Sequence, residues 1–128
     1  MSQAKHEDFR VGGFISLWLG NLNTEDEMDD YLGDGFENDF GFQIYTPDGP
    51  EGDVNEEGLI PIHELLIGFS RGESFVELGT EAAKTKGWDE ATSALVFYNF
   101  RYDPKFINPD FSGLFTFIGA FPYSGFGS

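Results

Sequence analysis

The sequence predicts a single α+β domain in which a small, mostly antiparallel sheet packs with three short helices. The chain has 128 residues, of which 40% are hydrophobic and 17% aromatic, including fifteen Phe, so one well-packed core can form. Short apolar runs alternate with segments that begin with helix-start signals, and neither a repeat nor a linker interrupts them. We therefore expect residues 1–128 to form one domain with flexible ends at 1–10 and 124–128.

Three apolar runs are expected to be strands, near residues 13–19, 93–102 and 114–121. Each is short and rich in β-branched or aromatic residues, which is typical of buried strands. The second and third are apolar on both faces, which predicts central positions in a sheet that helices cover. Residues 40–45 are a further candidate strand, and residues 46–58, rich in Pro, Gly and acids, are expected to be a loop.

The first helix is expected over residues 24–32. Thr24 and Glu27 fit a capping box, and acids in the first turn suit the helix dipole. Two glycines, Gly33 and Gly35, are expected to end this helix. The residues expected to face the sheet are Met28, Tyr31 and Leu32.

Two more helices are expected over residues 61–69 and 74–86. Pro61 can open the first, because its missing N–H costs nothing in the first turn. Ser74 and Glu77 fit a second capping box, which would start the second helix. The inner face expected for this second helix consists of Phe75, Val76, Leu78, Ala82 and Ala83.

Negative charge is concentrated in the front half of the chain. The net charge is −16, and residues 11–70 hold fourteen acids and no Lys or Arg. Such a chain repels nucleic acid and anionic membranes, whereas it attracts a basic protein. The alternative, an acidic surface that serves only solubility, predicts acids spread evenly along the chain.

The sequence has no cysteine and no long apolar segment. Disulfides, thiol catalysis and cysteine-ligated metals are therefore excluded. The N-terminus is polar and has no signal-peptide core, and no run reaches the roughly 18 apolar residues of a membrane helix. We expect a cytoplasmic protein without a cofactor.

One stretch matches a catalytic motif. Residues 68–72, "GFSRG", fit the G-x-S-x-G pattern of a nucleophile elbow centred on Ser70. That site needs a preceding strand and a later histidine, but the two histidines, His6 and His63, both precede Ser70. A glycine-containing loop between helices explains the stretch as well, so we expect no enzyme.

A second stretch matches a calcium loop. Residues 53–64 align with the twelve-residue pattern, with Asp53 first, Gly58 sixth and Glu64 twelfth. The fifth position is a bulky Glu57, and the prolines and glycines upstream forbid an entering helix. A calcium-binding module that uses this loop is the alternative interpretation; otherwise we expect no metal site.

Four stretches together resemble a known family. They are "ISLWLGNLNTEDEMDDYL", "FENDFGF", "ALVFYNFRY" and "FIGAFPY", in this order across residues 14–123. Their order and spacing are similar to those of the bacterial polymorphic-toxin immunity family numbered 22. Because these motifs consist mostly of apolar and turn residues, we expect them to specify the fold and not the binding site.

The resemblance implies a protein that binds and neutralises a cognate toxin encoded beside it, with a basic nuclease as the expected class. An acidic inhibitor can fill a cleft built for phosphate, which agrees with the charge distribution. The expected contact set consists of Glu25, Asp26, Glu27, Asp29, Asp30, Asp34, Glu37 and Asp39. Candidate aromatic anchors are Tyr31, Phe36 and Tyr45, which are otherwise core residues.

Overall fold

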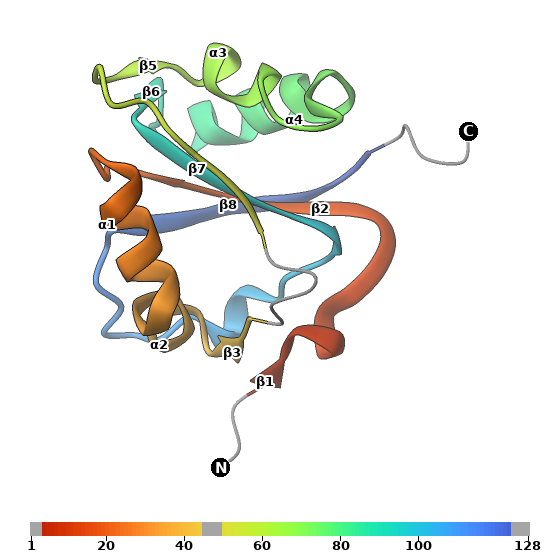
Figure 1. The fold of residues 1–128 in the computed structure, drawn as a ribbon. Helices are drawn as coiled ribbons and strands as arrows, with labels where there is room; N and C mark the ends of the chain where they lie inside the picture. The colour runs from red at the N-terminus through yellow and green to blue at the C-terminus, as the bar shows by residue number, and fades with distance from the viewer. Residues whose placement is uncertain (1–3, 45–49, 124–128) are drawn as a thin grey trace.

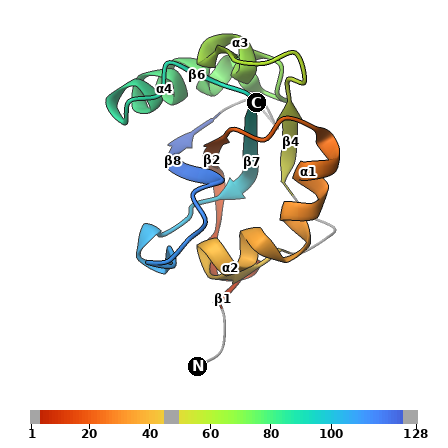
Figure 2. The same cartoon turned by 90° about the vertical axis from the view of Figure 1, so that its left-hand side faces the viewer.

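A four-stranded antiparallel sheet lies between two helical layers, as Figures 1 and 2 show. The computed structural model describes residues 4–44 and 50–123. The strand order is β4-β7-β2-β8. The strands are β2 (Arg10–Gly20), β4 (Glu51–Val54), β7 (Ser93–Phe100) and β8 (Phe115–Pro122). The α+β class predicted from the sequence is confirmed.

The three predicted strands are all present, but one lies at an unexpected position. The segments 13–19 and 93–102 correspond to the central pair, β2 and β7, and 114–121 corresponds to β8. The prediction that 114–121 is central is wrong, because β8 pairs with β2 alone and forms an edge of the sheet. Ile118 is an extra residue in this pairing, between Phe117 and Gly119, so the edge strand carries a bulge. Side chains of β8 reach both faces of the sheet, with Phe115 in one hydrophobic cluster and Ile118 in the other.

The opposite edge of the sheet is β4, within the segment expected to be a loop. Its residues "EGDV" pair with Ser93–Val96 of β7, and only Val54 is buried. A short, charged strand of this kind is typical of a sheet edge. Residues 45–49 of the predicted loop lie outside the described residues.

Two short pairs of strands complete the fold. Within 40–45, the structure has the strand β3 (Phe42–Gln43), which pairs in parallel with β1 (Ala4–Lys5). The strands β5 (Ile60–Pro61) and β6 (Glu90–Ala91) form a second small pair.

Residues 4–10, expected to belong to a flexible end, form β1, the turn η1 (His6–Phe9) and the start of β2. Phe9 is buried, and its ring lies 5.4 Å from that of Phe42 and 5.4 Å from that of Tyr102. The other expected flexible end, 124–128, lies outside the described residues.

The first helical layer is one continuous run, and the predicted stop at Gly33 and Gly35 is wrong. Thr24 does cap α1 (Glu25–Asp30) through the predicted capping box. A π-helical turn, η2 (Tyr31–Gly35), then leads directly into α2 (Phe36–Phe40). The wider turn places Tyr31 and Phe36, five residues apart, both toward the sheet. The run ends at Gly41, whose φ of +75° is the left-handed conformation that glycine favours at helix ends.

The second helical layer consists of α3 (Ile62–Ile67) and α4 (Gly72–Thr85), on the other face of the sheet. Pro61 precedes α3 as predicted. The capping box at Ser74 is wrong, because α4 begins at Gly72 and the Ser74 hydroxyl donates to the carbonyl of Arg71. Leu78 is exposed instead of inward, since the buried positions of α4 are 72, 75, 76, 79 and 83.

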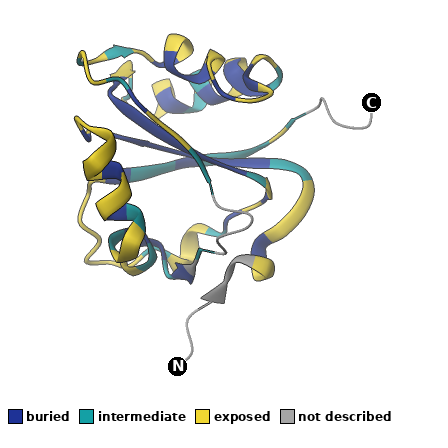
Figure 3. Cartoon of the chain, viewed as in Figure 1, coloured by how far each residue is buried: buried dark blue, intermediate teal, exposed yellow. Residues whose placement is uncertain are grey.

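The sheet separates two hydrophobic clusters. Figure 3 colours the residues by burial and shows buried positions on the inner sides of the helices and exposed positions on their outer sides. Trp18 is the centre of the first cluster, and its ring contacts those of Phe36, Phe97 and Phe117 at 4.9–5.4 Å. Phe117 is half-buried, as is Tyr98, which packs on the second cluster. The stretches that resemble the immunity family thus build this aromatic core.

Candidate functional site

The helical run α1–η2 presents a row of carboxylates to solvent. Figure 3 shows its outer face as exposed, in contrast to the buried inner face. Met28 and Tyr31 anchor the inner face in the aromatic cluster. The exposed acids are Glu25, Asp26, Glu27, Asp29, Asp30 and Asp34. We call these six residues the acidic row.

Two predicted contact residues also have roles within the fold. The Glu27 carboxylate accepts hydrogen bonds from the backbone N–H groups of Asn23 (2.7 Å) and Thr24 (3.2 Å), which completes the capping box. The half-buried Glu37 accepts from the backbone N–H of Ile44 at 3.0 Å. These carboxylates are therefore fixed in place by the chain around them.

Asp39 differs from the rest of the predicted set because it points inward and is only 6% exposed. Its carboxylate accepts hydrogen bonds from the hydroxyls of Tyr31 (2.7 Å) and Ser112 (2.6 Å) and from the backbone N–H of Ser112 (2.8 Å). Burial, the hydrogen bond to Asp39 and the charge of Asp39 together hold the pKa of Tyr31 far above its ordinary value. Asp39 therefore joins the helical run to the segment before β8.

A second group of acids lies beside α1. A hollow of about 290 Å³ separates α1 from β4, with Met28 and Val54 among its apolar residues and Glu25, Asp29 and Asp53 at its acidic side. The backbone N–H of Glu25 donates to the carboxylate of Glu56 at 3.1 Å. Acids from two distant parts of the sequence thus meet at one edge of the sheet.

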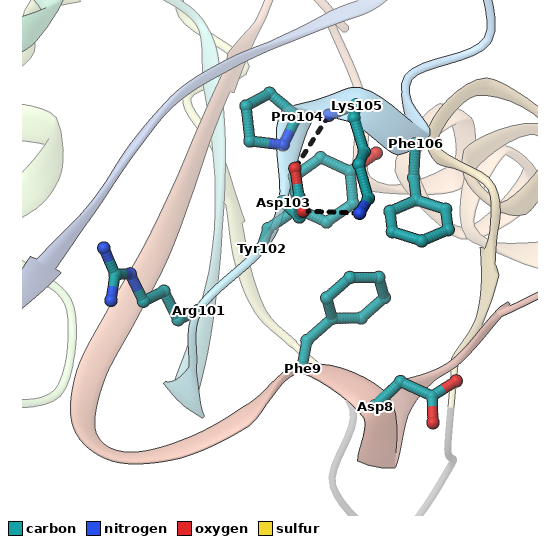
Figure 4. A pocket seen from close by; sticks show the side chains of 8 residues that line it. All are labelled: Asp8, Phe9, Arg101, Tyr102, Asp103, Pro104, Lys105 and Phe106. Atoms are coloured by element: carbon teal, nitrogen blue, oxygen red, sulfur yellow. Dashed lines mark hydrogen bonds and ion pairs between the residues drawn. The ribbon is translucent and has the colours of Figure 1, made fainter.

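The chain between β7 and β8, residues 101–114, forms the other notable surface. We call it the β7–β8 connection. Part of it borders a hollow of about 580 Å³, whose lining residues Figure 4 shows. The Phe9 and Phe106 rings meet edge to face there, with centroids 5.2 Å apart. Lys105 contacts Asp103 at 3.6 Å and the Phe106 ring at 5.5 Å, so its charge is partly satisfied.

The two motif matches, the G-x-S-x-G stretch and the alternative calcium loop, lie in surroundings that differ from those a catalytic or calcium site needs. Ser70 lies in a turn between α3 and α4, so no strand leads into it, and its backbone N–H donates to the Glu51 carboxylate at 3.1 Å. In the calcium alternative, Asp53 pairs with Ala94 inside β4, whereas Glu64 lies on α3. Across the described residues, no group of three or more His, Asp or Glu side chains is arranged to hold a metal ion.

The aromatic anchors proposed from the sequence do not form the apolar surface of the site, and the β7–β8 connection, which does expose apolar residues, was not among the predicted site residues. Tyr31 and Phe36 are core residues, and Tyr45 lies outside the described residues. The apolar side chains of the β7–β8 connection were not predicted. Their signal was a long segment between two strands that contains four large apolar residues, Phe106, Ile107, Phe111 and Leu114.

Comparison with known proteins gives one match. The family model for Immunity protein 22 matches residues 15–124. No curated protein and no solved structure matches the chain. Within the described segments, no helix is long and apolar enough to cross a membrane. Because the matched region covers most of the sequence and contains both hydrophobic clusters apart from Phe9, the chain belongs to the Immunity protein 22 family and has the toxin-neutralising role of an immunity protein.

Proposed function

We propose that this immunity protein neutralises its toxin by covering a basic surface of the toxin with the acidic row. The observation that carries the proposal is the exposure of all six carboxylates on one helical run, with no Lys or Arg between residues 11 and 70 to neutralise them. The acids beside β4, Asp53 and Glu56, extend the same negative surface.

Charge of this kind acts on the encounter between the two proteins. At physiological ionic strength, screening reduces interactions between exposed charges beyond about 8 Å, so one carboxylate steers weakly. A row of carboxylates on a rigid helix adds its fields and orients a cationic partner before contact. The Thr24–Glu27 capping box stabilises this geometry at the start of the helix.

A nuclease is the toxin class that fits this surface best. Nucleases bind phosphate groups in basic clefts, and a row of carboxylates offers a similar pattern of negative charge. Inhibition then requires only that the immunity protein occupy the cleft or its rim. The protein acts as a binding partner in this account, and none of its residues performs a chemical step.

Co-expression tests the proposed role. The toxin domain encoded by the adjacent gene is induced in a susceptible host with the immunity protein, with an empty vector, or with a variant in which the whole acidic row is changed to Asn and Gln. We expect survival with the native protein and death with the vector and the variant. Equal killing with and without the native protein would refute the role; full protection by a folded variant would refute the acidic mechanism.

A further inference from the structure

We propose that the β7–β8 connection is a preformed apolar docking element for the toxin, positioned next to the acidic row by Asp39. This inference rests on the proposed function and adds to it the surface that supplies affinity after charge has brought the proteins together. Its occupant is a toxin domain that carries an apolar recess beside its basic surface.

The connection exposes an unusual set of side chains. Phe106 is 38% exposed, Phe111 37% and Leu114 45%, all within nine consecutive residues. The other exposed large apolar residues are distributed over β2, the turn before β5, α3 and α4. Phe106 packs on the Phe9 ring, whereas Phe111 and Leu114 lie three residues apart and present two large apolar groups that one recess of a partner can cover.

The segment is tied to α2 by several polar contacts, of which those to the Asp39 carboxylate are part-buried. Asp39 accepts from both the backbone N–H and the hydroxyl of Ser112. The backbone N–H of Asn108 donates to the Asp39 carbonyl at 2.8 Å, and its side-chain amide donates to the Asn38 carbonyl at 3.1 Å. At Gly41, an added Cβ would lie 2.5 Å from the Phe106 carbonyl oxygen, so helix and connection are in close contact. An ordered segment loses little conformational entropy when it binds, which favours affinity.

The docking element and the acidic row lie on the same side of the sheet. Figure 2 shows the connection next to α2, which directly continues the run that carries the acids. Tyr31 links the two, because it donates to Asp39 and its ring stacks on Phe115 at 5.2 Å, just after the connection. A partner that meets the acids can therefore also reach Leu114 and Phe111.

This arrangement favours a basic toxin over a second copy of the chain. Two copies that met through this face would bring two acidic rows together, each on a protein with a net charge of −16. Like charges across an interface are strongly unfavourable. A cation-rich partner gains from the same arrangement, since its charges meet the acids while its apolar groups meet the connection.

The chain offers a matched pair of variants for the test. Leu114 lies in the docking element and is 45% exposed, whereas Leu78 lies on α4, on the opposite side of the sheet, and is 47% exposed. Binding kinetics are measured with the purified, catalytically inactivated toxin domain from the adjacent gene. We expect Leu114→Ala to raise the Kd about fivefold and Phe111→Ala about tenfold, mainly through faster dissociation, while Leu78→Ala stays within about twofold.

The outcomes separate this inference from the proposed function. Circular dichroism spectra that match the native protein show that each variant is folded. If Leu114→Ala and Phe111→Ala both bind like the native protein, the docking element is refuted while the immunity role stands. If the native protein itself does not bind the toxin domain, the proposed function fails and this inference fails with it.

Discussion

Replacing Asp39 should reveal how strongly one buried carboxylate joins the helical run to the β7–β8 connection. Asp39→Ala removes the acceptor of three hydrogen bonds, from the Tyr31 hydroxyl and from the hydroxyl and backbone N–H of Ser112. Hydrogen bonds to a charged group contribute about 1.5–3 kcal/mol each, and bonds that share one carboxylate do not add fully. We expect a loss of about 3–4 kcal/mol, a large part of the roughly 5–15 kcal/mol that stabilises a domain.

Asp39→Asn should cost less, and the geometry gives the reason. The oxygen that the amide nitrogen would replace accepts two hydroxyls, and hydroxyls can rotate to become acceptors. The remaining oxygen can still accept from the Ser112 N–H, so the pattern survives while the negative charge is lost. The expected cost is about 1 kcal/mol.

The measurement is urea unfolding at pH 7, followed by circular dichroism. Asp34→Ala is the control, because Asp34 is an exposed acid of the same run and should change the free energy of unfolding by less than about 0.5 kcal/mol. A cost below about 1 kcal/mol for Asp39→Ala would show that these hydrogen bonds do not hold the helical run to the β7–β8 connection, as would an equal cost for Asp39→Ala and Asp39→Asn.

Three further predictions test the fold around this link. Gly41→Ala should destabilise the protein by about 2 kcal/mol or more in thermal unfolding, because the φ of Gly41 is +75° and the new methyl group meets the Phe106 carbonyl. Gly33→Ala places its methyl group in open space, so it should be neutral or stabilising in the same experiment. The pKa of Tyr31 is raised in the folded state, so its hydroxyl keeps its proton at a pH where the unfolded chain loses it. The free energy of unfolding should therefore fall above about pH 10, and Tyr31→Phe should make that fall shallower when urea unfolding is measured at alkaline pH. The indole N–H of Trp18 is buried without a hydrogen-bond partner in the described structure, so Trp18→Phe should cost about 1–2 kcal/mol and Trp18→Ala about 3–5 kcal/mol by urea unfolding.

The regular elements could be predicted because local pattern and burial agree in them. The runs that became β2 and β7 are apolar on both faces, and helices cover both faces of the sheet. The same signal in the β8 segment did not reveal that it lies at an edge, because a connection and helix α4 cover parts of it. Pairing order depends on contacts between distant residues, which a single segment does not record.

Where prediction failed, long-range contacts overrode local preference. Gly33 and Gly35 signal a helix end, yet the run continues because Phe36 and Phe40 bury their rings against Trp18. The residues "EGDV" have weak strand preference, and pairing with β7 makes them a strand. Neither outcome follows from the local sequence alone.

In the candidate site, too, features set by the local sequence were predicted, whereas features set by long-range contacts were not. The charge bias of residues 11–70 predicted an acidic surface, and the capping box correctly placed the start of the helix that carries it. Sequence reasoning could not separate Asp39 from its neighbours, since that carboxylate turns inward only because Ser112 approaches it from another part of the chain. The β7–β8 connection became visible as a surface only once the structure showed which of its side chains are exposed.

The part that the acidic row plays in binding can be measured as the rate of association with the toxin domain over a series of salt concentrations. The variant Asp29→Lys, Asp30→Lys, Asp34→Lys is compared with Glu64→Lys, Glu77→Lys, Glu81→Lys on α3 and α4, and each changes the net charge by +6, from −16 to −10. We expect the first variant to associate at least about tenfold more slowly at low salt and to lose most of the salt dependence, while the second stays close to the native protein. Equal effects of the two variants would contradict a binding site on the acidic row.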